Sequence, residues 1–373
     1  MADRIINYDP AYNTVDRDDF ASLVEVDRYG ERSKDFDRII SGTAEHFWDP
    51  LDPRYVDFEK DKLNLQEQTI MPREFCIELQ TAVADKLDEQ QKIRMANQNT
   101  RFVLSSILHG EQGALSLSAA LTSVLRDPGA QEYAANQARE EARHVAGFSN
   151  YINSRWGSPL ASGSTLRSLL CDIVRPGVVY KKLVGMQLLI EGLAMGAFGT
   201  LQRDTHDPTL RNVVRFTMAD EAAHHKFGKI WADKTIPKLS DEEHEDVEKW
   251  AAECFQVLLF NLVNSEQKQE IYQEFGLDWQ WVRSAIMEAF SDEDRRESMT
   301  NNTNVFRVLI KTLFNAGIIT DRTKHVYAQW VDMDELARED DEVPGMDVAE
   351  EATQTLIEIN SEHVKRSPRY RVN

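Results

Sequence analysis

The chain has 373 residues, of which 42% are hydrophobic, and a formal net charge of −20 at pH 7. This length allows one large domain or two, with a sizeable buried core. The acidic balance argues against nucleic acid as a partner, because phosphate groups attract a basic surface. No apolar run reaches the roughly 18 residues of a membrane span, so we expect none.

Localisation is predicted from the first residues and from the cysteines. The N-terminus lacks the apolar core of a signal peptide, which favours the cytoplasm. Cys76, Cys171 and Cys254 are scattered and form no paired motif, as expected for ordinary thiols in a reducing compartment.

Residues 1–60 are predicted to form an irregular N-terminal arm that wraps a helical body. The arm is rich in aromatic residues and turn formers, and it shows no sustained helical period before a short helix that starts near Asp35 and ends near Phe47. A disordered tail is the alternative. Trp48, Tyr55 and Phe58 argue against it, because they carry apolar area worth burying.

Residues 61–330 are predicted to form one helical domain, followed by an acidic linker and a C-terminal helix over 331–373. Apolar residues recur with the helical period, and no strand-like alternation is found. We therefore expect an all-α fold. Its predicted helices span residues 73–92, 95–125, 130–155, 165–174, 178–203, 208–235, 240–264, 277–291, 300–316 and 346–364.

Two Glu-x-x-His motifs are the most informative feature of the chain. Glu141 and His144 form the first, Glu221 and His224 the second, and on a helix this spacing places both side chains on one face. Glu111 and Glu191 each lie thirty residues before a motif glutamate. One such motif could arise by accident in an acidic chain with nine histidines, whereas two with matching upstream glutamates form a strong signal.

Turn signals indicate that each upstream glutamate comes level with its motif. Asp127-Pro128-Gly129 lies sixteen residues after Glu111 and fourteen before Glu141, so the arms of a helical hairpin would be roughly 24 and 21 Å long. The turn at 204–208 divides the second pair in the same way. Two hairpins joined by a crossover at 156–177 make a four-helix bundle with one long connection.

The six side chains predict a site for two divalent cations. Four carboxylates facing one interior cannot be buried without compensation, and they cancel the charge of two divalent ions. Oxygen and nitrogen ligands suit iron or manganese. The alternative is that both motifs lie on solvated helix faces. The predicted metal ligands are Glu111, Glu141, His144, Glu191, Glu221 and His224.

Further residues are expected to support the site. Glu140 is predicted to accept a hydrogen bond from His224, and Asp220 from His144, with Arg143 anchoring one of these acids. The alternative is that the acids lie on the surface. Helical spacing predicts a substrate pocket lined by Leu115, Phe148, Met195 and Phe198, although core packing would explain the same side chains.

The Glu…Glu-x-x-His pairs resemble those of the ferritin-like di-iron carboxylate superfamily over about residues 95–235. This superfamily includes ribonucleotide reductase radical subunits, hydroxylase subunits of bacterial oxygenases, acyl carrier protein desaturases and arylamine oxygenases. Phe148 stands where the reductases usually carry a tyrosine. Met195 and Ala223 replace a threonine and an arginine of the methane and toluene hydroxylases, and Thr217 replaces a histidine of the arylamine oxygenases. No subfamily is therefore identified.

The resemblance implies an enzyme that activates O₂ at two iron ions and hydroxylates, epoxidises or desaturates a small apolar or aromatic substrate. Electrons would come from a separate reductase or ferredoxin, because the chain has neither a GxGxxG motif nor a four-cysteine module. Two alternatives stay open. One is a ligand-binding or radical-forming oxidase, with an Mn/Fe or a di-iron centre. The other is a metal-binding subunit without turnover. The oligomeric state is also open, a homodimer included.

Overall fold

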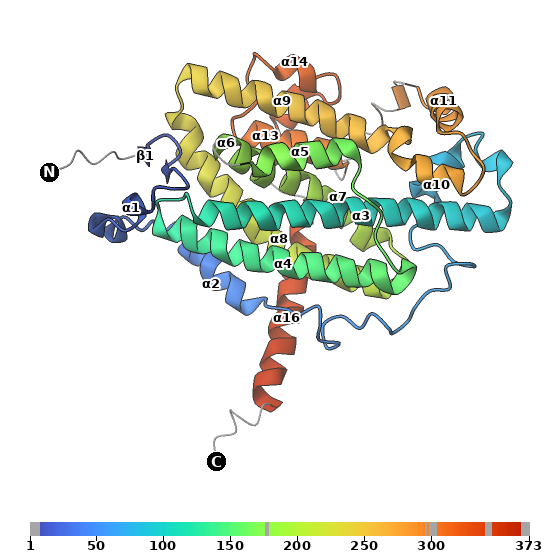
Figure 1. Ribbon diagram of the computed structural model, residues 1–373, viewed down its shortest axis with the longest axis horizontal. Helices are drawn as coiled ribbons and strands as arrows, with labels where there is room; N and C mark the ends of the chain where they lie inside the picture. The colour runs from blue at the N-terminus through green and yellow to red at the C-terminus, as the bar shows by residue number, and fades with distance from the viewer. Residues whose placement is uncertain are drawn as a thin grey trace.

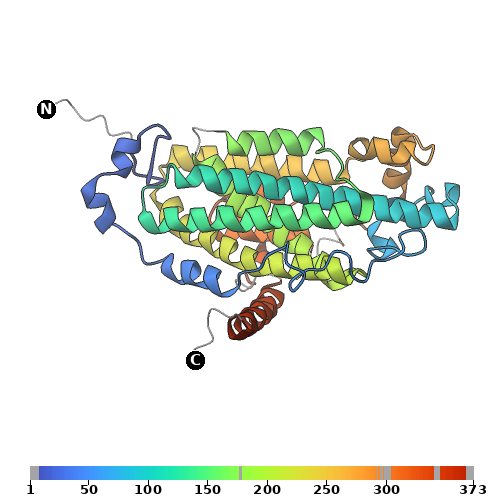
Figure 2. The same ribbon diagram turned by 60° about the horizontal axis from the view of Figure 1, so that its bottom comes forward.

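The chain folds almost entirely into helices. The computed structural model describes residues 8–175, 179–291, 293–294, 297, 304–339 and 345–366, and within them the only strands are β1 (Tyr8–Asp9) and β2 (Thr14–Val15), which pair antiparallel. The predicted all-α class is confirmed. Long helices lie side by side along the long axis of the molecule (Figures 1 and 2).

The first helical hairpin consists of α3 (Glu89–Thr122) and α4 (Pro128–Trp156). Asp88 caps α3 by accepting from the amide of Gln91, whose side chain in turn accepts from the Asp88 amide. Asp127 caps α4, and Pro128 occupies its first turn, where proline costs no hydrogen bond. The predicted Asp-Pro-Gly turn therefore lies at the hairpin bend.

The first arm of the second hairpin is a less regular helix. It begins as α6 (Val179–Lys182), continues as the π-helix η5 (Leu183–Ile190) and ends as α7 (Glu191–Asp204). The Glu191 amide donates to the Met186 carbonyl, five residues back, instead of the usual four. Asp207 then caps α8 (Pro208–Thr235), which packs against α7 and α4.

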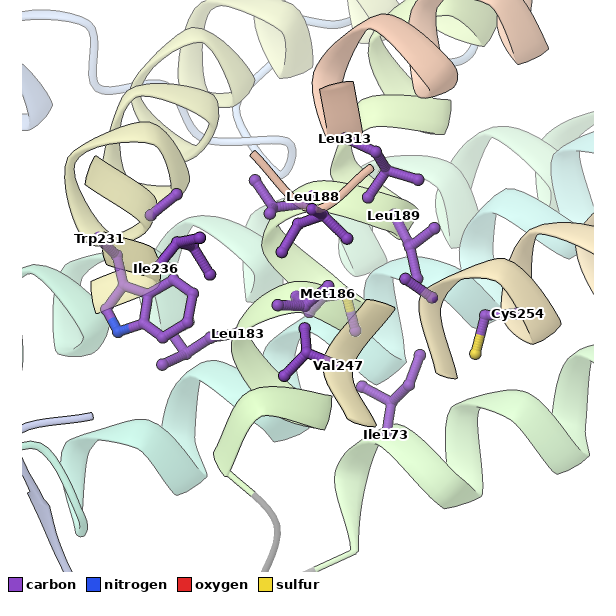
Figure 3. Packing of buried hydrophobic residues seen from close by; sticks show 14 of the residues in the cluster. Ile173, Leu183, Met186, Leu188, Leu189, Trp231, Ile236, Val247, Cys254 and Leu313 are labelled. Atoms are coloured by element: carbon purple, nitrogen blue, oxygen red, sulfur yellow. The ribbon is translucent and has the colours of Figure 1, made fainter. Parts of the chain in front are cut away.

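The largest hydrophobic core surrounds η5. Leu183, Met186, Leu188 and Leu189 are buried there, enclosed by neighbouring helices (Figure 3). The enclosing side chains come from α5 (Ser164–Val174), α8, α9 (Asp241–Val263) and α13 (Val305–Asn315). By length and composition the segment Val179–Asp204 could cross a membrane, but 72% of its most apolar window is buried inside the protein. Packing in this core accounts for its apolar character.

The predicted helix over 73–92 is wrong. The chain instead makes the short 3₁₀ turns η2 (Arg73–Phe75), η3 (Ile77–Gln80) and η4 (Ala84–Lys86) before α3 begins at Glu89. Thr81 is extended between two of these turns, and its hydroxyl accepts from the Val83 amide. Such a local hydrogen bond competes with the helix. Glu78 is held from outside the segment by Lys268 and Tyr272.

The N-terminal arm reaches into the helical body. Trp48 is fully buried and Tyr55 is 5% exposed, as predicted, so this part of the arm is not a disordered tail. The side chains of Tyr55 and Asn360 are hydrogen bonded, and the Asn360 amide also donates to the Phe47 carbonyl. The C-terminal helix α16 (Met346–Arg366) thus lies against the arm, and it projects from the body in Figures 1 and 2.

The remaining helices are short. The predicted linker after residue 331 contains one of them, because Asp332 caps a helical turn. These elements are α1 (Phe20–Leu23), η1 (Val26–Gly30), α2 (Asp37–Glu45), η6 (Ile236–Lys238), η7 (Ser265–Lys268), α10 (Gln269–Gln273), α11 (Trp279–Ala289), α14 (Lys324–Tyr327) and α15 (Met333–Leu336).

Candidate metal centre

Six buried side chains from four helices converge between the two hairpins. Their ligand atoms form two adjoining groups, within each of which all atoms lie within 4.8 Å of one another. None of the six residues is more than 6% exposed. They are the six predicted from the motifs: Glu111 on α3, Glu141 and His144 on α4, Glu191 on α7, and Glu221 and His224 on α8.

The first group is centred on Nδ1 of His144. This nitrogen lies 3.2 Å from Oε2 of Glu111 and 3.2 Å from Oε2 of Glu141. Oε1 of Glu221, on the facing helix, also lies 3.2 Å away. Two ligands about 2.1 Å from one ion and at right angles to it would be about 3.0 Å apart, so the spacing suits a shared cation.

The second group repeats this arrangement around His224. Its Nδ1 atom lies 3.2 Å from Oε1 of Glu141 and 3.2 Å from Oε2 of Glu221, and Glu191 completes the group. Glu141 and Glu221 therefore belong to both groups, and each turns one oxygen towards each imidazole. Glu111 belongs only to the first group and Glu191 only to the second.

Two acids that are not candidate ligands orient the two imidazole rings. Nε2 of His144 lies 2.9 Å from Oδ2 of Asp220, and Nε2 of His224 lies 3.0 Å from Oε2 of Glu140. An N–H at Nε2 that donates to each acid would leave the Nδ1 lone pair available to an ion bound between the carboxylates. These are the pairings expected from the sequence, in which each acid immediately precedes a motif glutamate.

Arg143 joins the two outer acids. Its guanidinium lies 2.8 Å from Oδ1 of Asp220 and 3.4 Å from Oε1 of Glu140. Burial opposes ionisation of Asp220, but Arg143 and His144 hold the pKa of this carboxyl below its usual value. The outer acid of His144 is thus kept charged.

Two residues of the N-terminal arm also contact the outer acids, and the sequence patterns did not predict these contacts. The indole N–H of Trp48 donates to Oδ2 of Asp220 at 2.9 Å. Nε2 of His46 lies 3.3 Å from Asp220 and 3.6 Å from Glu140. No local pattern links these residues to Asp220, because more than 170 positions separate them from it.

Two glutamines support the opposite side of the centre. The Gln137 amide donates to Oε1 of Glu141 and to Oε1 of Glu191, both at 3.2 Å. Gln187 in η5 donates to Gln137 at 3.1 Å. Each glutamine precedes a candidate ligand by four residues, so the helical i, i+4 spacing could have identified both.

Two carboxylates of the centre, Glu111 and Glu191, are short of positive charge. Burial raises the pKa of Glu111 to about 8, against an ordinary value of 4.5. Burial, with repulsion from Glu221 and Glu141, raises the pKa of Glu191 well above its usual range. Oε1 of Glu221 lies 3.2 Å from Nδ1 of His144 but makes no well-directed hydrogen bond among the described residues. Bound cations would resolve both the repulsion and the missing partner.

An apolar cavity of about 310 Å³ adjoins the centre. It lies between α3 and α7, with Glu111 and Glu191 in its wall. The other lining residues are Met71, Phe75, Asn99, Thr100, Phe102, Val103, Ser106, Ile107, Gly110, Ala114, Leu166, Ile190, Leu193, Ala194, Ala197, Phe198, Thr200, Leu201, Leu258 and Val305.

Of the four predicted pocket residues, only Phe198 lines this cavity. Leu115 and Met195 each follow a lining glutamate by four residues, which places them about 40° around the helix from it. They lie on the side of that glutamate opposite to the other lining residues of the helix. Met195 packs into a neighbouring core. The Phe148 ring is buried behind Phe198, with 5.8 Å between the stacked ring centroids. Leu115, Phe148 and Met195, which were predicted to line a substrate pocket, are therefore not part of this cavity's described lining.

These residues could coordinate metal ions through carboxylate oxygens and imidazole nitrogens, next to a space for an organic molecule. Comparisons of the chain with models of protein families, with curated proteins and with solved structures found no match.

Proposed function

We propose that the chain is an O₂-activating oxidoreductase of the ferritin-like di-metal carboxylate type. It would hold two iron ions, or one manganese and one iron, and act on an apolar or aromatic molecule in the adjacent cavity. The observation that carries this proposal is the sharing of Glu141 and Glu221 between two adjoining groups, each of which has its own histidine.

Each ion would have a distinct set of ligands. Glu111 and His144 would hold one ion, Glu191 and His224 the other, and Glu141 and Glu221 would bridge them. Four carboxylates balance the charge of two divalent ions, and no cysteine belongs to either group. When bound, such a pair of ions supplies the two electrons with which O₂ is activated.

The remaining residues would prepare this centre. Asp220 and Glu140 would hold the protons of both imidazoles at Nε2, so that Nδ1 is available to an ion. Arg143 compensates the outer acids. The apolar walls along α3 and α7 would exclude water and place the substrate beside Glu111 and Glu191. Electrons for further turnovers would come from a separate reductase or ferredoxin.

Metal analysis combined with a single-turnover measurement tests the proposal. The purified chain should bind two ions, with anomalous scattering at the iron or manganese edge from both groups. The reduced protein should then consume O₂, and the Glu141→Ala variant should not. A single bound ion, or O₂ consumption unaffected by Glu141→Ala, would reject the proposal.

A radical-forming oxidase is the second candidate, favoured by Tyr133. This tyrosine lies two turns before Glu141, is fully buried, and has no hydrogen-bond partner for its hydroxyl among the described residues. Burial, together with the charges of Glu140 and Glu221, raises its pKa well above 10.0. A stable organic radical in electron paramagnetic resonance that disappears in Tyr133→Phe would favour this candidate over turnover of a bound substrate.

A further inference from the structure

The cavity beside the metal centre is elongated. Its lining follows α3 from Asn99 to Ala114 and α7 from Glu191 to Leu201. At 1.5 Å per helical residue these stretches are about 22 and 15 Å long. The N-terminal part of α3 and the end of α7 lie together, because Ile70 contacts both. Its amide donates to the side chain of Asn97, and its carbonyl accepts from the amide of His206. Glu111 and Glu191 are therefore distant from the end formed by Asn99 and Leu201.

Phe75 lies beside Asn99 at the far end of the cavity, where the lining reaches the surface. This side chain is 42% exposed, and it is the most exposed of the described residues that line the cavity. Met71 and Asn99 beside it are buried. A ligand that enters past Phe75 would extend inward, with its leading end reaching Glu111 and Glu191.

The described lining residues include no cation for a charged head group, and Lys268, which donates to Oδ1 of Asn99 at 2.7 Å, is already paired with Glu78. No lysine, arginine or histidine is among the described lining residues. The hydroxyls of Thr100, Ser106 and Thr200 already donate to the carbonyls four residues earlier on their own helices. The Asn99 amide donates to the carbonyl of Phe75. Among the described lining residues, the only titratable groups are the two glutamates at the inner end, and these offer an anion no positive charge.

We propose that this cavity selects an uncharged hydrocarbon chain and rejects the corresponding carboxylate. At the roughly 30 Å³ that one water molecule occupies in the liquid, 310 Å³ equals the volume of about ten water molecules, which suits a medium-length alkyl chain. An uncharged chain leaves no unpaired charge along these walls, whereas a carboxylate buried between Phe75 and the metal centre would have no basic side chain among the described lining residues beside it. The inference deepens the proposed function by naming its substrate class, but the binding step does not depend on metal chemistry.

Ligand affinity of the full-length protein tests the selectivity. Decan-1-ol and decanoate share a ten-carbon chain and differ in head-group charge, so calorimetry at neutral pH compares the two directly. We expect decan-1-ol to bind at least tenfold more tightly. Equal affinities, or tighter binding of decanoate, would overturn the inference.

Two glycines provide a matched pair of variants that locates the binding. A Cβ atom added at Gly110 or at Gly199 meets no other atom within 4 Å, but only Gly110 lines the cavity. Leucine is also the better helix former, so both replacements should fold. Gly110→Leu should lower the affinity for decan-1-ol at least tenfold, and Gly199→Leu should leave it within twofold. Equal effects of the two variants would show that the alcohol binds elsewhere and would overturn the inference.

Ala194→Leu, in the opposite wall of the cavity, repeats the test without altering a neighbour of Glu111. It should weaken binding in the same direction as Gly110→Leu. Unchanged affinity in both variants would contradict the assignment of the cavity.

Adding a cation at the opening should reverse the selectivity. Phe75→Arg would supply the missing partner, while Phe75→Leu controls for loss of the ring. We expect the arginine variant alone to raise the affinity for decanoate at least fivefold. An increase in both variants, or in neither, would count against a charge-selective opening at Phe75.

The outcomes for binding and for oxidation are distinguishable. Selective binding of decan-1-ol by metal-loaded protein that consumes no O₂ would reject the proposed function and leave the inference standing. O₂ consumption stimulated by decanoate and not by decan-1-ol would reject the inference and leave the proposed function standing.

Discussion

Oδ2 of Asp220 on α8 lies 2.9 Å from Nε2 of His144 on α4, and both residues are fully buried. The acid therefore fixes the ring of a candidate ligand that comes from the facing helix. Glu140 on α4 and His224 on α8 form the reciprocal pair at 3.0 Å. Each helix thus supplies both a candidate ligand and the acid that orients the other helix's ligand.

Removing the charge of either outer acid should weaken metal binding. We expect Asp220→Asn and Glu140→Gln to lower metal affinity about 10–100-fold, because the imidazole loses its orienting acceptor. Titration with Fe(II) or Mn(II), followed by metal analysis, measures the change. Asp172→Asn, at an acid paired with Lys181 outside the centre, is the control and should have no effect. Normal affinity in Asp220→Asn would contradict the assigned role.

Shared and unshared carboxylates should differ in their effect on stoichiometry. Glu111 belongs to one group only, so Glu111→Gln should remove one ion and leave the ion held by Glu191 and His224. Glu141 belongs to both groups, so Glu141→Gln should weaken both sites. Metal content per chain after gel filtration distinguishes the two results. Equal loss in the two variants would argue against bridging by Glu141.

Metal binding should release protons at neutral pH. Burial raises the pKa of Glu111 to about 8, so this carboxyl is largely protonated at pH 7 in metal-free protein and must lose its proton to coordinate an ion. Affinity should therefore increase as the pH rises from 6 to 8. Calorimetry in two buffers with different ionisation enthalpies counts the protons released. Identical heats in both buffers would rule out the coupling.

The same shift predicts how pH affects the stability of the metal-free fold. The folded-state pKa of Glu111 lies above its ordinary value of 4.5, so the folded state binds this proton more tightly than the unfolded state does. The stabilisation of the folded state by protonated Glu111 is fully present below pH 4.5. It is lost as the pH rises through about 8, which lowers the free energy of unfolding by up to a few kcal/mol. The free energy of unfolding from urea titrations should fall less steeply over this window in Glu111→Gln.

A buried ion pair should stabilise the segment before α3. Lys268 lies 2.8 Å from Glu78, which also accepts from Tyr272 at 2.7 Å. Lys268→Met leaves the buried carboxylate without its cation and should cost about 3–5 kcal/mol of unfolding free energy. Adding Glu78→Gln removes the charge and keeps an acceptor for Tyr272, so the double variant should recover part of this loss. A double variant less stable than Lys268→Met would contradict the account.

This pair also predicts sensitivity to acid. Burial alone would raise the pKa of Glu78, but Lys268 and Tyr272 together lower it to about 2. A depressed folded-state pKa stabilises the fold above pH 4.5, and the contribution is lost as the pH falls towards 2. The unfolding free energy of the wild type should therefore drop over this range by more than that of the double variant.

Local patterns predicted most helices of the described chain and the residues of the centre. Pro128 and Pro208 open α4 and α8 where the turn signals place them, because capping and proline geometry act within a few residues. The helix predicted over 73–92 failed because contacts from Lys268 and Tyr272 compete with its local preference. The π-helix before Glu191 was also missed, since its apolar residues fit an ordinary helix equally well.

The sequence by itself determined that Glu141 and His144, like Glu221 and His224, share a helix face, because helical period is a local property of the backbone. Only the tertiary structure decided that Glu141 and Glu221 each turn one oxygen towards each histidine. It also decided that Trp48 reaches Asp220 and that the cavity lies on the Gly110 side of Glu111. These features depend on the rotation and offset of packed helices, which arise from many long-range contacts and leave no mark at a fixed spacing in the chain.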